Sequence, residues 1–268
     1  MTTNKKQLAV GLKRAVLFQL DANGYPLAVG TQAYEGVEII GPKAYTLTVP
    51  ESRKISHIGN DRVLAIDYLP PTEGVSGELR VGSNDIEAKA LVSAVSVFPI
   101  GDGDAMPWGT DQQGFEEDVA LLLFQQSLDA ITKSRRWKYY LMPKARVVPS
   151  PASMDENAAE DRYTVAPNPT AFHLWGTALD VGTEGVTEMA FAEGMAVARP
   201  NIVAFKADGS TSSFLLPVGK PAKSVSSIVV WVNGVLQTGT ELGTVTTTEI
   251  PFDVLPDADD IVVVYYEY

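Results

Sequence analysis

The chain has 268 residues, a hydrophobic fraction of 45% and a formal net charge of −12, and it contains no cysteine. This length suits one large domain or two ordinary ones, and no apolar run approaches the roughly 20 residues of a membrane-spanning helix. A strongly acidic surface repels phosphate, which disfavours an ordinary nucleic-acid-binding role. The absence of cysteine excludes disulfides, thiolate nucleophiles and cysteine metal ligands.

The N-terminal region predicts an arm followed by β structure. Residues 1–12 are expected to form a flexible or partner-dependent arm. Lys13–Leu20 is a predicted strand, Asp21–Gly24 a turn and Tyr25–Val29 the returning strand. Tyr34–Ile40 predicts a further strand, which the following Gly-Pro pair ends.

The segment that organises the chain runs from Lys43 to Val81. Side chains of different chemistry alternate in three predicted strands, Ala44–Val49, Arg62–Leu69 and Val75–Val81. Side chains in a strand project with period two, so each strand has two different faces. The polar segment Glu51–Asp61 joins the first two strands, and ordering a long polar loop costs chain entropy. We therefore expect this loop to contact a partner.

Beyond this segment the pattern predicts one short helix. Ser83, Asn84 and Asp85 are candidate N-caps, and apolar residues recur at helical spacing over Ile86–Val97. We expect this helix to pack on a sheet. Phe98–Gly114 is rich in Gly, Asp and Pro, which predicts a loop.

The next stretch is expected to complete a first domain. Val119–Gln126 is a continuous apolar run, which fits a helix or a buried strand. Arg136–Val148 predicts an aromatic-rich strand, and its Pro143 indicates an edge or a bulge. Residues 149–161 are expected to form an acidic loop. The predicted closing strands are Asp161–Pro167 and Ala171–Leu179.

The composition changes at Asp180–Glu188, which we interpret as a linker between domains 1–186 and 187–268. The second domain has short strands joined by tight turns, and Asn233-Gly234 is a strong hairpin signal. Strands of this length and spacing predict a small β-sandwich of the immunoglobulin-like kind. The strands expected here are Asn201–Lys206, Ser212–Pro217, Ser227–Val232, Val245–Pro251 and Ile261–Tyr266, with another turn at Asp208-Gly209.

Three stretches carry a resemblance to a known family. The run ISHIGNDRVLAIDYLPPTEGVSGELRVG resembles the core of the tail tube proteins (major tail proteins) of long-tailed bacteriophages, as do WKYYLMPKARVVP and MDENAAEDRYTVAPNPTAFHLWGTAL. The pattern spans residues 10–180 approximately and favours a strand for Val119–Gln126. The C-terminal IVVWVNGVLQT and IPFDVLPDADDIVVVYY resemble the decorating modules appended to phage tail proteins.

The resemblance implies a structural virion protein of mainly β fold and no enzymatic activity. Hexameric rings would form a continuous inner β-barrel and stack into a tube that conducts genomic DNA without binding it specifically, in a channel made repulsive by the acidic chain. The implied partners are other copies of the chain, the tape measure protein and the tail terminator and tip proteins. The implied location is the virion tail, assembled in the host cytoplasm.

Two sets of candidate residues follow from the resemblance. The candidates for the face that lines the channel are Thr46, Thr48, Ser76, Glu78 and Arg80. The candidates for contact between stacked rings lie in and beside the polar loop, and they are Glu51, Arg53, Lys54, His57, Asp61 and Arg62. Alternation alone does not say which face of each strand points inward.

Two other kinds of chemistry are considered and disfavoured. The only histidines are His57 and His173, and no G-x-S-x-G nucleophile elbow accompanies them. Acidic runs at 102–104 and 257–260 could offer oxygen ligands to calcium but lack the EF-hand spacing. We therefore expect no catalytic residue, metal, cofactor or membrane contact.

Tryptophans leave a second hypothesis open. Trp108, Trp137 and Trp175 could form a carbohydrate platform, although packing in a core or interface is the commoner role of such residues. A cell-surface or carbohydrate-binding β-module is therefore the alternative function.

Overall fold

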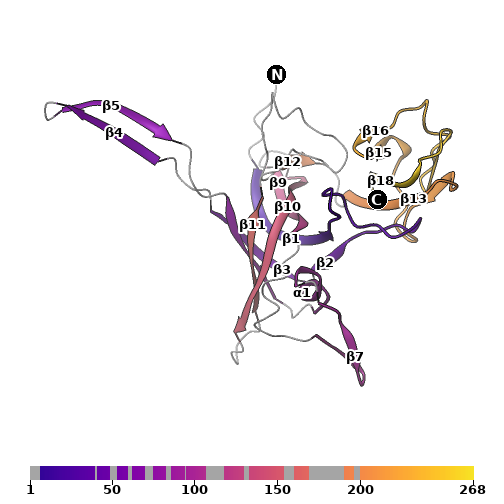
Figure 1. The fold of residues 1–268 in the computed structure, drawn as a ribbon, viewed down its shortest axis with the longest axis horizontal. Helices are drawn as coiled ribbons and strands as arrows, with labels where there is room; N and C mark the ends of the chain where they lie inside the picture. Colours follow the sequence, from indigo (N-terminus) through magenta and orange to yellow (C-terminus); the bar gives the residue numbers. More distant parts are fainter. Residues whose placement is uncertain are drawn as a thin grey trace.

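The computed structural model describes residues 7–39, 41–48, 53–59, 62–69, 75–82, 86–93, 95–106, 118–129, 133–153, 160–168, 190–195 and 200–268. Within these ranges the chain is mainly β and its ladders are antiparallel, which confirms the predicted class. Figure 1 shows a body of packed sheets with one α-helix and two projecting hairpins. In the described part of the chain, no helix is long and apolar enough to cross a bilayer.

One eight-stranded sheet forms most of the N-terminal half. Its order is β2-β1-β9-β10-β11-β6-β3, and β12 pairs with β10 beside this path. The strands are β1 (Gln7–Gln19), β2 (Val37–Ile39), β3 (Pro42–Thr48), β6 (Ser76–Val81), β9 (Asp118–Asp129), β10 (Arg135–Ser153), β11 (Glu160–Pro167) and β12 (Ala190–Met195).

Helix α1 (Ile86–Val92) covers one face of this sheet and completes the first core. Ala88 and Val92 of the helix are buried with residues such as Leu79 and Tyr163 of the sheet. The helix confirms the predicted packing but ends earlier than predicted, because Val95–Val97 is not helical and leads into another strand. The three candidate N-caps lie outside the described residues.

The run Val119–Gln126 is a strand, as the resemblance favoured, and lies inside β9. Val119, Leu121 and Leu123 are buried in the first core, while Leu122 and Phe124 are buried in a second core on the opposite face. A strand with both faces covered has no polar face, which explains why its sequence does not alternate.

Pro143 lies at an irregularity of β10, where the register against β9 shifts between Met142 and Ala145. The predicted bulge is therefore confirmed. The predicted edge is wrong, because β10 pairs with β9 and also with β11 and β12.

The C-terminal part contains two further sheets with a third core between them. The four-stranded sheet has the order β13-β18-β15-β16, and β14 pairs with β17. Phe205 and Tyr266 of the first sheet and Phe214 and Ile250 of the second are buried together. The elements are β13 (Pro200–Asp208), β14 (Ser213–Leu215), η2 (Val225–Ser227), β15 (Val229–Val232), β16 (Val235–Leu236), β17 (Glu249–Pro251) and β18 (Ala258–Glu267).

The Asn233-Gly234 hairpin turn is confirmed. The two residues have φ of 45° and 82°, the positive values that a type I′ turn requires. This turn joins β15 to β16 and keeps Trp231 opposite Leu236.

The second core joins the C-terminal layers to the large sheet. Phe18 and Phe124 from the large sheet are buried against Ile202, Trp231 and Val263 of the four-stranded sheet. The backbone also crosses the junction, since Tyr34 and Ala204 exchange two hydrogen bonds of 2.8 and 3.0 Å. The two halves of the chain therefore share a hydrophobic core, whatever the conformation of the predicted linker, which lies outside the described residues.

Two hairpins leave the body of the molecule (Figure 1). One pairs β4 (Arg53–Gly59) with β5 (Arg62–Leu69), and the other pairs β7 (Phe98–Ile100) with β8 (Gly103–Ala105). The predicted loops Glu51–Asp61 and Phe98–Gly114 are therefore wrong over these strands. Pairing within a hairpin satisfies backbone groups that an open loop would leave to solvent.

Other boundaries also differ from prediction. β1 begins at Gln7, so the predicted arm is partly a strand, held by its ladder to β9. Residues 149–153 continue β10, where an acidic loop was expected. The returning strand at Tyr25–Val29 is reduced to one bridge between Leu20 and Pro26. The predicted strand Ala171–Leu179 lies outside the described residues.

Candidate functional site

The exposed face of β3, β6 and β11 brings together the five residues that were candidates for the channel. Thr46 lies opposite Glu78, and Thr48 lies opposite Ser76. Arg80 follows on the same face, two residues beyond Glu78. These side chains are exposed or half-buried, while their neighbours Leu79 and Val81 point into the first core. Alternation therefore grouped these residues on one face correctly, but the structure does not identify that face as a channel wall.

Neighbouring strand β11 extends this polar face. Arg162 lies opposite Arg80, and Thr164 lies opposite Glu78. Neither residue was among the candidates, although the alternation within the predicted strand Asp161–Pro167 indicated that they share a face. The pairing of β11 with β6 crosses a long sequence separation, so sequence reasoning could not place these residues beside Glu78.

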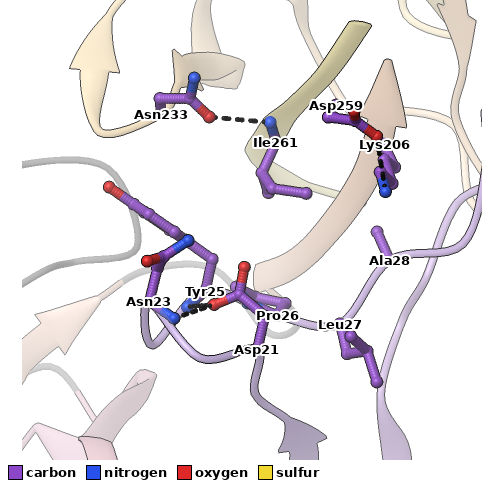
Figure 2. A pocket seen from close by; sticks show the side chains of 10 residues that line it. All are labelled: Asp21, Asn23, Tyr25, Pro26, Leu27, Ala28, Lys206, Asn233, Asp259 and Ile261. Carbon is purple, nitrogen blue, oxygen red and sulfur yellow. Dashed lines mark hydrogen bonds and ion pairs between the residues drawn. The ribbon is translucent and has the colours of Figure 1, made fainter. Parts of the chain in front are cut away.

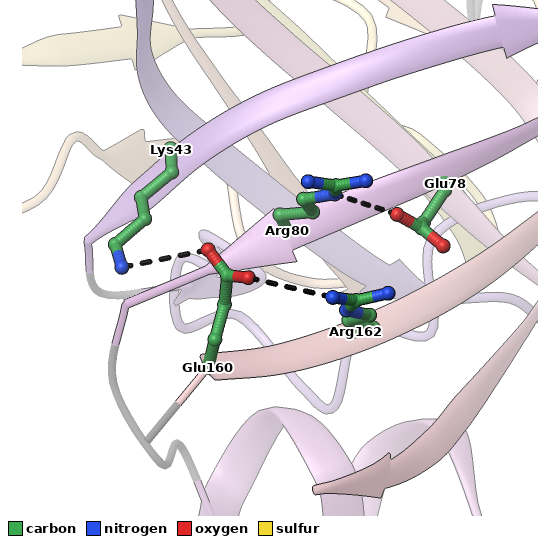
Figure 3. A network of polar contacts seen from close by, with 5 residues as sticks. All are labelled: Lys43, Glu78, Arg80, Glu160 and Arg162. Atoms are coloured by element: carbon green, nitrogen blue, oxygen red, sulfur yellow. Dashed lines mark hydrogen bonds and ion pairs between the residues drawn. The ribbon is translucent and has the colours of Figure 1, made fainter. Parts of the chain in front are cut away.

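Ion pairs connect the charged residues of this face (Figure 3). The Arg80 Nε donates a hydrogen bond of 2.6 Å to the Glu78 Oε1. Glu160 lies 3.5 Å from the Lys43 Nζ through one carboxylate oxygen and 3.8 Å from the Arg162 Nη2 through the other. The hydrogen bond from Arg80 lowers the pKa of Glu78, and the charges of Arg80 and Arg162 act in the same direction.

The charge of this cluster differs from that of the whole chain. Lys43, Arg80 and Arg162 supply three cations against the carboxylates Glu78 and Glu160. The large negative surplus of the chain therefore lies elsewhere. A surface of this kind can contact solvent, an anionic polymer or another protein surface, and its paired charges favour a defined register over high affinity.

The segment expected to contact a stacked ring forms the β4–β5 hairpin. Arg53, Lys54 and His57 lie on β4 and Arg62 on β5, so they belong to paired strands where a loop was expected. The register joins Arg53 to Leu69 and His57 to Ala65. Glu51 and Asp61 lie outside the described residues. No third strand pairs with this hairpin among the strands that the structure describes.

The acidic runs serve local turns in the described structure. Asp260 accepts hydrogen bonds from the Asn233 Nδ2 and from the Asp257 backbone N–H, at 2.6 and 2.8 Å. Asp259 lies 2.7 Å from the Lys206 Nζ. Asp102 and Asp104 are exposed on the β7–β8 hairpin. Among the described residues, no group of three or more His, Asp or Glu could hold a metal ion.

A cleft of about 400 Å³ lies where the first turn of the chain meets turns of the C-terminal layers (Figure 2). Asp21 accepts backbone hydrogen bonds from Asn23 and Tyr25, at 2.8 and 2.9 Å. Asn233 accepts one of 2.9 Å from the Ile261 backbone. These polar groups hold turns on both sides of the cleft. Its lining includes Asp21, Asn23, Tyr25, Lys206, Asn233 and Asp259.

Of the three tryptophans that could form a carbohydrate platform, the structure describes Trp137. Trp137 is half-buried and packs against the second core, which is a packing role. Trp108, Trp175 and His173 lie outside the described residues.

Scans against protein-family models, curated proteins and solved structures found no match to this chain.

Proposed function

We propose that this chain is the tail tube subunit of a long-tailed phage, a structural protein whose hexameric rings stack into a conduit for genomic DNA. The observation that carries the proposal is the β4–β5 hairpin, which projects from the body without a further strand beside it in the described structure (Figure 1). An isolated two-stranded hairpin is at best marginally stable in water, so an arm of this kind requires a partner.

The large sheet supports the same proposal. Its first face is packed on α1 and the core, and its other face along β3, β6 and β11 is polar. β3 is the end strand of the sheet, and it lies beside β1 without a ladder between them in the described ranges. Closing such sheets between copies into one inner barrel would remove their exposed edges. In this arrangement residues 1–186 form the tube, and an immunoglobulin-like domain at 187–268 decorates its exterior.

The charges of the polar face limit how the channel can work. DNA that passes through a tube should be repelled on average, because attractive contacts accumulate along its length. The net charge of −12 favours repulsion of DNA by the chain as a whole. The cluster in Figure 3, however, has one more cationic side chain than it has carboxylates. If this face lines the channel, the repulsion must come from carboxylates on other parts of the wall. The tape measure protein and the terminator and tip proteins would be the remaining partners in the virion.

Electron microscopy of the purified full-length chain tests the proposal. We expect stacked rings or tubes with six-fold symmetry. A variant in which a short Gly-Ser turn replaces Arg53–Leu69 is the matched control, because it removes the arm and leaves the large sheet intact. This variant should form rings that do not stack. A wild-type chain that stays monomeric at high concentration would overturn the proposal.

A further inference from the structure

The β7–β8 hairpin, residues Phe98–Ala105, presents an uncovered apolar face, and we call it the finger. Phe98 and Ile100 lie on one face of its first strand and are 45% and 61% exposed. Their cross-strand partners are Ala105 and Gly103, which are too small to cover them. Neighbouring large apolar side chains that are exposed on a ribbon projecting from the body are available for contact with another surface.

The tip of the finger is acidic. Gly101 has φ of 61° and opens the two-residue turn, a conformation that favours glycine. Asp102 in the turn and Asp104 beside it are exposed. Asp104 pairs with Pro99 and so lies on the face opposite Phe98 and Ile100, which leaves Asp102 in the turn as the carboxylate at the end of the apolar face.

A groove of complementary character lies between β1 and β3. It has a volume of about 230 Å³ and opens where these strands approach one another. Its apolar lining is Leu12, Tyr45, Leu47, Leu123 and Tyr140.

The charges at this groove are positive. Lys43 belongs to its lining, and the Lys138 Nζ lies 5.0 Å from the centroid of the Tyr140 ring. The described lining contains no carboxylate. Lys43 also lies 3.5 Å from Glu160, and its side chain is 48% exposed, so it can meet a second carboxylate.

We propose that the finger of one copy docks in the β1–β3 groove of a second copy of this chain. The apolar face would extend the first core, and the Asp102 carboxylate at the tip would meet Lys43 or Lys138. Finger and groove are different surfaces, so the contact is heterologous, and its repetition generates a closed ring or a filament. The inference rests on the proposed self-assembly and names the surfaces that make it.

Cysteine cross-linking in the assembled chain tests the contact directly, because the natural sequence has no cysteine. Ile100→Cys supplies a finger thiol, and Leu47→Cys supplies one on the groove face of β3. A disulfide requires Cα atoms within roughly 7 Å. We expect mild oxidation of a mixture of the two variants to give a covalent dimer between them. Neither variant alone should do so, and Ile100→Cys mixed with the exposed Val218→Cys is the control.

Substitutions then test the apolar and charged parts separately. Phe98→Ser with Ile100→Ser should weaken self-association about tenfold or more, because each buried large apolar side chain favours the complex. Val235→Ser with Leu236→Ser removes a similarly exposed pair from the β15–β16 hairpin and should have no such effect. Lys43→Glu should weaken association, and Asp102→Lys should restore part of it. Sedimentation velocity measures these changes.

The outcomes separate this inference from the proposed function. If wild-type chains assemble but the finger variants assemble equally well and the disulfide between positions 100 and 47 does not exceed the Val218 control, the docking inference fails alone. If wild-type chains do not assemble and the two cysteine variants do not cross-link, both fail. Selective cross-linking together with weakened association of the finger variants supports the contact.

Discussion

Asp208 holds the turn after β13 with its own side chain. Its Oδ1 accepts backbone hydrogen bonds from Ser210 and Thr211, at 2.8 and 2.7 Å. These bonds favour the charged carboxylate and lower the pKa of Asp208 to about 2 from its ordinary 3.8. A group whose folded pKa is depressed contributes stability above its unfolded pKa and loses it as the pH falls through the folded one.

Asp208→Ala should therefore reduce the stability of the protein at neutral pH. The difference between variant and wild type should shrink as the pH falls from about 4 towards 2, where the wild-type carboxylate becomes protonated. Urea denaturation across this range measures the difference. A difference that stays constant with pH would show that the charge of Asp208 does not stabilise the turn.

Alanine substitutions at Gly36 and Gly219 distinguish the cost of backbone strain from the cost of a steric clash. Both have positive φ, 71° and 81°, which costs other residues about 1–2 kcal/mol. A Cβ at position 36 would lie 2.5 Å from the Leu17 carbonyl oxygen, while one at position 219 would meet nothing within 4 Å. Gly36→Ala should therefore cost about 1–3 kcal/mol more than Gly219→Ala in urea denaturation. Equal losses would mean that the contact with Leu17 relaxes freely.

At the level of elements, the sequence predicted strands correctly where one face of the strand is polar or where a turn residue marks the end of the strand. β6 and the Asn233-Gly234 hairpin were found in this way. Residues 119–126 could not be assigned from periodicity, because the strand is buried on both faces in two different cores. The helix was placed correctly at its start and too long at its end, since the spacing of Val97 continues the helical pattern into non-helical residues.

The β4–β5 hairpin shows why polar strands escape prediction. Arg53–Gly59 has few large apolar residues, so its composition indicated a loop and only the Gly-Asn pair indicated a turn. The ladder to β5 supplies the pairing that composition did not predict. The arm is nevertheless a two-stranded ribbon, for which local opening costs little free energy.

Hydrogen exchange tests the role of this arm in the proposed tube. Backbone amides of Arg53–Gly59 and Arg62–Leu69 should exchange quickly in the monomer and slowly in the assembly, because a neighbouring ring would hold the hairpin closed. The buried amides of β9 are the internal control and should be protected in both states. Equal protection of the arm in both states would argue against its role in stacking.

At the level of the whole molecule, the sequence predicted the composition of the candidate face but not its neighbours. Alternation grouped Thr46, Thr48 and Glu78, whereas Glu160 and Arg162 join them only through the pairing of β11 with β6. The second core was missed for a related reason. Phe18 and Trp231 are far apart in the chain, and each fits a core of its own half equally well by sequence.

Glu78→Lys tests whether the polar face lines a DNA channel. The change leaves the Figure 3 cluster with four cations and one carboxylate. We expect genome release from mutant particles to be slower, most of all at low salt, where the Debye length is about 30 Å at 0.01 M against about 8 Å at 0.15 M. Glu78→Gln is the control with half the change in charge. An unchanged rate at both ionic strengths would place Glu78 away from the DNA, and a loss of assembly would place it at a subunit contact.

Truncation after Thr187 tests how far the two halves depend on one another. The sequence predicted that residues 1–186 form an independent domain, and that prediction stays open. In the structure, such a fragment loses the partner of Val16, Phe18, Leu122 and Phe124, which the C-terminal layers bury. A large exposed apolar patch is rare on a monomeric protein and promotes association.

We therefore expect the fragment to bind a hydrophobic dye and to aggregate before it forms ordered rings. The same fragment with Leu122→Gln and Phe124→Gln should bind less dye and stay soluble, because both side chains face the missing layers. Dye fluorescence and light scattering, followed by electron microscopy, distinguish these outcomes. An unmodified fragment that remains free of dye and forms rings would show that the second core joins two domains without stabilising either, and that assembly belongs to residues 1–186 alone.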